Sequence, residues 1–238
     1  NREQLVMATK VGSATKEHGF DIRQEHVLRS IDESLQRLQT DYIDLFYTHF
    51  DDDKTPVEET LSAYDEAIKA GKIRYIAASN LSPKRLTDSF NASEKEGLPK
   101  YVVFQPLYNL VERTEYEKEY LPLVEKYGLS VFPYSSLASG FLSGKYRSEA
   151  DFGKSVRGGG AKKYLNEKGL AVLNALDKVS GKHDTSQAAV ALAWLAAQPH
   201  VGAPIASATS KSQLDTLFDS TRLSLDKEDL EMLDNASR

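Results

Sequence analysis

Residues 31–49 read IDESLQRLQTDYIDLFYTH, and this stretch decides the fold class. In its first part the apolar residues Ile31, Leu35 and Leu38 recur at helical spacing, which predicts an amphipathic helix. Its second part, Ile43–Thr48, is a short apolar run, which predicts a buried strand. A helix followed closely by a buried strand is typical of a chain that alternates between α and β elements.

The same alternation continues in both directions from this stretch. The expected strands are Leu5–Ala8, Ile43–Thr48, Ile73–Ala78, Tyr101–Phe104, Leu129–Pro133 and Gly202–Ala206. The expected helices are His26–Leu38, Val57–Ala70, Pro83–Phe90, Glu115–Tyr127, Tyr164–Ser180, Ser186–Ala197, Ser210–Phe218 and Asp226–Asn235. A long segment rich in Gly, Ser and Lys, Ser139–Lys163, is expected to be a functional or mobile loop.

Repeated strand–helix units predict a parallel sheet, and the even composition predicts a single domain over residues 1–238. An open doubly wound sheet would show the same periodicity. However, no strand is followed by the G-x-G-x-x-G sequence of a Rossmann dinucleotide site.

The composition excludes several classes of function. With a net charge of -5, the chain has no basic field for nucleic acid or a membrane surface. No apolar run approaches the ~18 residues of a membrane span. The absence of cysteine excludes disulfides, thiolate metal sites and a cysteine nucleophile. We expect a cytoplasmic protein.

Polar residues follow every expected strand. In chain order they are Lys10, His49, Ser79 with Asn80, Gln105, Tyr134 with Ser135 and Ser136, and Ser207 with Thr209. A single lysine at a strand end, such as Lys10, is more often solvated than catalytic. A single histidine after an apolar run, such as His49, is more often structural than catalytic. Because chemistry in a β/α barrel sits at the carboxyl ends of the strands, the full set predicts an active site.

No metal site is expected. The histidines show no ligand spacing; they are His18, His26, His49, His183 and His200. The carboxylates of Asp51–Asp53 could bind a cation, but three consecutive side chains cannot all point at one ion. We interpret this run as a solvated loop.

Three motifs together resemble the aldo-keto reductase family: MATKVG at residues 7–12, the stretch at residues 31–49, and FQPLYN at residues 104–109 preceded by Ala78–Asn80. The later YSSLASGFLSGKY, residues 134–146, is similar to the bacterial and potassium-channel-β-subunit branch of that family. The resemblance covers essentially the whole chain. It implies a TIM (β/α)8 barrel, of which this chain would hold about the last six β/α units.

The resemblance also implies a reaction. Family members transfer hydride from NADPH to a carbonyl, while a tyrosine protonates the developing alkoxide. A lysine held by an aspartate lowers the pKa of that tyrosine, because a nearby cation favours the phenolate. A histidine orients the carbonyl. Lys10 matches the lysine and His49 matches the histidine.

One departure from the family is important. The aspartate and tyrosine lie in a D-x-A-x-x-Y-G motif that has no match here, and the first expected strand matches the family's third. We therefore expect two further β/α units upstream, in a longer parent protein, which the non-Met start favours; a naturally shortened relative is the alternative. Tyr47, Tyr108 and Tyr134 match positions that the family uses otherwise, so none is assigned as the acid.

Most cofactor positions of the family have a match. The resemblance implies that Ser79, Asn80 and Gln105 hold the nicotinamide carboxamide and that Tyr134 stacks on the ring. The residues implied at the phosphates and the adenosine end are Ser135, Ser136, Leu137, Ala138, Lys145, Arg157, Ser207, Thr209 and Gln213. NADPH is the expected cofactor. NADH is the alternative, because Lys211 is the one basic residue in the stretch 207–213.

The leading hypothesis is therefore an NADPH-dependent enzyme that reduces a small-molecule aldehyde or ketone. A nucleotide-sensing regulatory subunit like the channel β subunits is a second hypothesis, and a catalytically incomplete relative is a third. His49 argues against the second, because those relatives carry another residue there. Neither the physiological substrate nor the oligomeric state can be predicted from the sequence.

Overall fold

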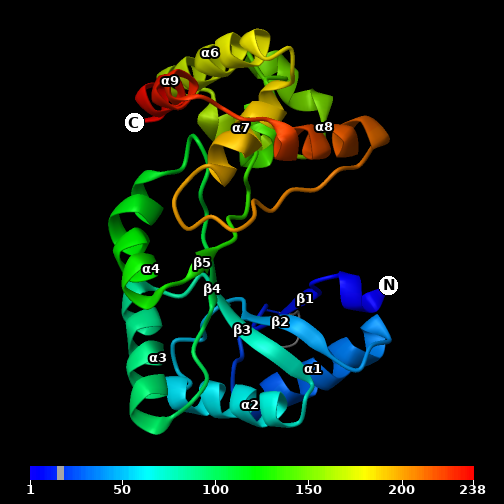
Figure 1. Ribbon diagram of the computed structural model, residues 1–238, viewed down its shortest axis with the longest axis vertical. Coiled ribbons are helices and arrows are strands. Elements are labelled where there is room, and N and C mark those ends of the chain that lie inside the picture. The colour runs from blue at the N-terminus through cyan, green and yellow to red at the C-terminus, as the bar shows by residue number, and fades with distance from the viewer. Residues whose placement is uncertain (15–18) are drawn as a thin grey trace. The chain divides into compact units, whose positions relative to one another are not determined.

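Five strands form one sheet in the order β1-β2-β3-β4-β5 in the computed structural model, which describes residues 1–14 and 19–238 (Figure 1). The strands are β1 (Ala8–Val11), β2 (Ile43–Thr48), β3 (Ile73–Ser79), β4 (Val103–Gln105) and β5 (Ser130–Val131). The pairs β1–β2, β2–β3 and β3–β4 are parallel. Because these strands run parallel, the carboxyl ends of β1–β4 lie at the same end of the sheet.

The chain divides into two compact units. Unit 1 comprises Asn1–Gln105 and Leu123–Ser130, and unit 2 comprises Pro106–Pro122 and Val131–Arg238. Helix α4 (Leu121–Tyr127), which follows a π-helical turn at Tyr116–Tyr120, contributes residues to both. The expected single domain over residues 1–238 stays a prediction.

Unit 1 is built around β2, all six residues of which are buried. The amphipathic helices α1 (Gln24–Leu38), α2 (Val57–Lys69) and α3 (Pro83–Glu96) cover the sheet: α1 packs against β1 and α2, while α2 packs against β3 and α3 (Figure 1). α3 begins where the Ser82 hydroxyl accepts a hydrogen bond from the backbone amide of Arg85.

Unit 2 is mainly helical. Its helices are α5 (Gly158–Ala161), α6 (Glu167–Lys182), α7 (Gln187–Ala196), α8 (Lys211–Arg222) and α9 (Lys227–Ser237). The alanine-rich α7 is the core element, with eight of its residues buried, and it packs against α6 and α8. α6 also packs against α9. None of the helices in the described parts of the chain is long and apolar enough to cross a membrane.

Two expectations about the strands are wrong. The first strand begins at Ala8 rather than Leu5, after a 3₁₀ turn at Arg2–Gln4, because Leu5 is exposed and contributes nothing to the core. The sixth expected strand, Gly202–Ala206, is not formed: only Val201 makes an isolated bridge, to Val131. Pro204 has no amide to donate to a ladder, and much of the segment is exposed. The described chain therefore has five strands rather than six.

The expected loop at Ser139–Lys163 is more structured than predicted. Apart from α5, short 3₁₀ turns occur at Ala138–Ser143, Glu149–Lys154 and Lys162–Tyr164. The buried Tyr146 fixes the segment, because its hydroxyl lies 2.6 Å from Oγ of Ser155.

Candidate functional site

Lys10 lies on β1 directly across from Tyr47 on β2, and its ammonium group is 5.1 Å from the centre of the Tyr47 ring. The strand pairing fixes this placement, since the two residues are partners in the parallel register. Partial burial of the ammonium group lowers the pKa of Lys10. Among residues 1–14 and 19–238, no carboxylate forms an ion pair with it, so its charge is not neutralised by a neighbour.

His49 follows β2 and is held on both sides by backbone contacts. Its amide donates to the carbonyl of Val11 at 2.8 Å, and its own carbonyl accepts from Nδ2 of Asn80 at 2.9 Å. Burial, and then the charge of Lys10, lower the pKa of the imidazole. The lowered pKa favours the neutral imidazole, which carries a single ring N–H.

Ser79, Asn80 and Gln105 form a connected group at the ends of β3 and β4. The buried Ser79 hydroxyl donates to the backbone carbonyl of Gln105 at 2.9 Å and lies 3.1 Å from Nδ2 of Asn80. Asn80 is the exposed member and adopts a left-handed conformation, with φ of 52°. The structure thus brings all five predicted residues of unit 1 to the ends of its neighbouring strands.

The tyrosines that were left unassigned do not have the properties of a general acid at neutral pH. Burial raises the pKa of Tyr47 to about 12, against a smaller opposing effect of its hydrogen bond to Gln105. Burial also raises the pKa of Tyr108 and of Tyr134. A general acid works best with a pKa near the operating pH, so none of the three qualifies.

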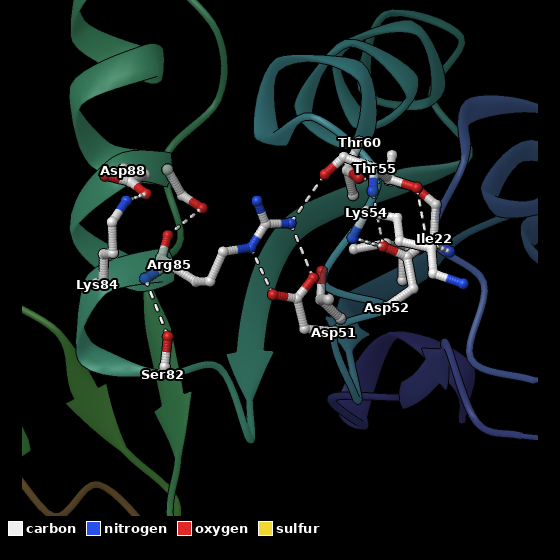
Figure 2. Close-up of polar contacts among 12 residues, drawn as sticks. Ile22, Asp51, Asp52, Lys54, Thr55, Thr60, Ser82, Lys84, Arg85 and Asp88 are labelled. Carbon is white, nitrogen blue, oxygen red and sulfur yellow. Dashed lines mark hydrogen bonds and ion pairs between the residues drawn. The ribbon is translucent and has the colours of Figure 1, made fainter.

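The acidic run after His49 is structural (Figure 2). Asp51 pairs with the guanidinium of Arg85, and the same guanidinium donates to the carbonyl of Thr55 at 2.9 Å. Asp52 accepts hydrogen bonds from the amide and the hydroxyl of Thr55 at 2.8 and 2.6 Å. The solvated-loop interpretation is therefore wrong for Asp51, whose side chain is only 8% exposed.

The described residues contain no cluster of three or more His, Asp or Glu side chains that could hold a metal ion. His18 lies outside the described residues.

Unit 2 contains a cavity of about 760 Å³. Eight of the ten site residues predicted in this unit line it: Ser135, Ser136, Leu137, Lys145, Arg157, Ser207, Thr209 and Gln213. The sequence did not predict several other hydroxyl-bearing residues of its wall: Ser139, Ser143, Ser155, Ser186 and Thr216. No local sequence pattern marks them, because they come from separate segments that only the fold brings together.

The charge of the cavity is one-sided. Lys145 and Arg157 line it, whereas none of the residues described along its wall carries a carboxylate. Neither cation forms an ion pair elsewhere in the described structure. Unpaired cations beside many hydroxyl groups make this a cavity suited to an anion, and phosphate oxygens would accept from both kinds of donor.

One wall of the cavity has a strained backbone. Ser135, Ser139 and Gly140 of this wall have positive φ angles, between 57° and 88°. Each such non-glycine residue costs about 1–3 kcal/mol and is retained mostly at functional sites. Strain concentrated at the cation-lined cavity is a second, independent indication that this wall binds a ligand.

Several predicted residues have additional structural tasks. Ser136 is buried, and its Oγ lies 2.8 Å from the carbonyl of Ile205 and 3.1 Å from that of Pro133. Oε1 of Gln213 accepts from both the amide and the hydroxyl of Thr209 at the start of α8.

Tyr134 and Ala138 are the two predicted residues of unit 2 that are not part of the cavity wall. Tyr134 is half-buried, and its amide donates to the carbonyl of Pro106 at 2.9 Å. Ala138 is fully buried.

Comparison with known proteins identifies the family. The sequence model of the Aldo/keto reductase family matches residues 1–238. The chain belongs to the aldo/keto reductase family. Among curated proteins it is 33% identical to a probable voltage-gated potassium channel subunit beta of Oryza sativa subsp. japonica, over 90% of this chain and 67% of that protein. It is 34% identical to an uncharacterized oxidoreductase of Bacillus subtilis, over 98% of this chain and 72% of the relative.

A solved structure supports the fold. A thermostable aldo-keto reductase crystallised with the inhibitor epalrestat matches with a TM-score of 0.77 and 28% identity, over 99% of this chain and 73% of that one. This confirms the predicted fold class, a TIM-barrel aldo/keto reductase fold of which the chain spans a part. Family membership supports an oxidoreductase.

Proposed function

We propose that this aldo/keto reductase chain belongs to an enzyme that reduces aldehydes or ketones to alcohols with NADPH. The observation that supports the proposal most is the cavity of unit 2, which is lined by Lys145 and Arg157 and by no described carboxylate. A dinucleotide carries several phosphate charges, and these two cations would neutralise part of them. When bound, the reduced nicotinamide would supply the hydride.

The residues of unit 2 would hold the phosphate and adenosine parts of the cofactor. Ser135, Ser136 and Leu137, which line the cavity, would present backbone and hydroxyl donors to the pyrophosphate. Ser207, Thr209 and Gln213 would contact the adenosine end near the first turn of α8, where the free amides of a helix favour an anion. Tyr134 would stack on the nicotinamide ring.

The residues of unit 1 would handle the nicotinamide carboxamide and the carbonyl. Asn80, whose Nδ2 donates to the carbonyl of His49 and to Oγ of Ser79, would offer its Oδ1 as an acceptor to a carboxamide, and the side-chain amide of Gln105 has both a donor and an acceptor group. The neutral His49 would donate a hydrogen bond to the carbonyl oxygen. Lys10 would supply a fixed positive charge to the group that protonates the product.

That proton donor is not one of the three tyrosines assessed above, because burial raises the pKa of each. We therefore propose that the acid would be a tyrosine of the family's D-x-A-x-x-Y-G motif, which residues 1–238 do not contain. Its pKa would be lowered by the charge of Lys10, in accordance with the effect of a nearby cation on a phenol.

Turnover decides between the enzyme and a nucleotide-sensing subunit, an alternative favoured by the similarity to a potassium channel β subunit. The full-length protein that carries this chain is mixed with NADPH and a generic aldehyde. Consumption of NADPH in step with aldehyde, at a rate far above the mixture without protein, is expected. Tight NADPH binding without consumption would contradict the enzyme proposal and support a sensor.

A further inference from the structure

Ser13, which none of the roles above includes, contacts the ring of His49. Its Oγ lies 2.7 Å from Nδ1 of His49, a short hydrogen-bond distance. Among residues 1–14 and 19–238, the imidazole is the one hydrogen-bond partner that the structure gives to this hydroxyl. The contact joins two segments 36 residues apart in the sequence.

The backbone brings Ser13 to this position through Gly12. After β1 the chain turns at Gly12 with φ of +92°, a backbone conformation that residues other than glycine rarely adopt. A Cβ at this position would lie 2.6 Å from the carbonyl oxygen of Phe50, so the two backbones are in close contact. The amide of His49 donates a hydrogen bond to the carbonyl of Val11, two residues before Ser13. The backbone around His49 and the backbone around Ser13 are therefore fixed relative to each other.

Two further contacts hold His49, one at its ring and one at its backbone. The Phe50 ring lies 4.4 Å from the imidazole, centre to centre, and Asn80 donates to the carbonyl of His49. The nearby acidic side chains are engaged elsewhere: Asp51 with Arg85, and Asp52 with backbone and side-chain groups of the same loop (Figure 2). Lys10 is the charged group whose field acts on the ring.

A neutral imidazole has two tautomers, and the hydrogen bond at one nitrogen decides which is present. If Nδ1 carried the proton, Nε2 would be an acceptor and would repel a carbonyl oxygen. If Nε2 carries the proton, Nδ1 must accept, and a serine hydroxyl is a suitable donor.

We propose that Ser13 is a positioning residue that donates its hydroxyl proton to Nδ1 of His49 and so fixes the tautomer with its N–H on Nε2. The ring then presents a hydrogen-bond donor, not an acceptor, to the oxygen of the carbonyl substrate. This last step rests on the proposed reductase function, whereas the choice of tautomer does not.

The test is ¹⁵N NMR of protein with labelled histidine, in which the signal of His49 is assigned with the His49→Gln variant. The native protein is expected to show an unprotonated Nδ1 and a protonated Nε2 at neutral pH. Ser13→Ala should mix the tautomers and raise the pKa of His49, because a hydrogen bond that favours the neutral ring is lost. Ser13→Thr should restore both. Ser30→Ala is the matched control, since Ser30 lies beside a different ring, that of His26.

Activity gives a second readout. Ser13→Ala should lower kcat/KM for the carbonyl substrate by about threefold to tenfold, the usual worth of one hydrogen bond, with NADPH affinity unchanged. A proton on Nδ1 in the native protein, or a tautomer and pKa that do not respond to Ser13→Ala, would overturn the inference. If the tautomer depends on Ser13 but the native protein reduces no carbonyl, the positioning role stands and the proposed function fails.

Discussion

The ammonium group of Lys10 lies 5.1 Å from the ring centre of Tyr47, its direct partner across β1 and β2. A cation is stabilised over an aromatic face. Unlike a carboxylate, the ring of Tyr47 does not neutralise the charge of Lys10. Since the same charge lowers the pKa of His49, Lys10 acts on the groups around it.

Lys10→Met is expected to abolish most carbonyl reduction and to leave NADPH affinity nearly intact. General acid–base assistance is typically worth about 10²–10⁴-fold, and a loss of that order in kcat is expected. The pKa of His49 should rise, because a neighbouring positive charge is removed. Steady-state kinetics with a generic aldehyde measures kcat, and a fluorescence titration with NADPH measures the affinity.

The control is Lys72→Met, which removes a partly exposed lysine that pairs with Asp32. It should change neither quantity. If NADPH affinity falls in step with kcat in Lys10→Met, then Lys10 is a cofactor ligand and the role assigned to it is wrong.

Gly12→Ala should destabilise the protein by about 2–4 kcal/mol, as two costs combine: a left-handed backbone and a Cβ in contact with Phe50. Gly71 has a similar φ of +74° and open space where a Cβ would be, so Gly71→Ala isolates the backbone cost, about 1 kcal/mol. Urea unfolding of both variants measures the difference. Equal losses in the two would show that the close approach at Gly12 contributes nothing.

Asp229 links α6 to α9 and should make stability depend on pH. Its carboxylate, 1% exposed, accepts from Lys182 at 2.8 Å and from His183 at 2.7 Å. Burial alone would raise its pKa, but these hydrogen bonds outweigh it and lower the pKa to about 2. A depressed carboxylate stabilises the fold above its unfolded pKa, near 3.9, and this contribution is lost as the pH falls toward about 2.

Asp229→Asn should therefore cost about 2–3 kcal/mol at pH 7 and flatten the loss of stability between about pH 4 and pH 2. Glu231→Gln is the control, because Glu231 lies on the same helix in an exposed pair with Lys227. Chemical denaturation at several pH values provides the measurement. A variant whose stability still falls as steeply as that of the native protein would contradict the assignment.

The sequence predicted the β-α alternation well where burial decides the structure. β2 is fully buried and matches its predicted bounds, Ile43–Thr48, because a short apolar run is most stable as a buried strand. The sixth strand failed because backbone pairing depends on Pro204 and on exposure, neither of which hydrophobic spacing registers. The glycines at residues 158–160 lie in the expected loop Ser139–Lys163, yet they form part of α5, where a Cβ on Gly158 would lie 1.9 Å from the carbonyl oxygen of Phe152.

The candidate site was predicted in part for a similar reason. Residues at strand ends, such as His49 and Asn80, can be found from sequence because the fold class fixes where strands end. Ser13 could not, since its contact with His49 depends on the turn at Gly12. Nor could the pairing of Asp51 with Arg85, which joins the loop after β2 to the first turn of α3.

NADPH titration of cavity variants tests the central claim most directly, because the account depends on the cation-lined cavity of unit 2 binding the phosphates of the cofactor. Binding is measured for the native protein, Lys145→Met, Arg157→Met and the control Lys154→Met, whose lysine pairs with Asp151 in the same segment and is not part of the cavity wall. The account predicts that Lys145→Met and Arg157→Met each weaken NADPH binding by about tenfold or more, the worth of a charge-assisted hydrogen bond, while Lys154→Met has little effect. Unchanged affinity in both cavity variants, or an equal loss in the control, would contradict it.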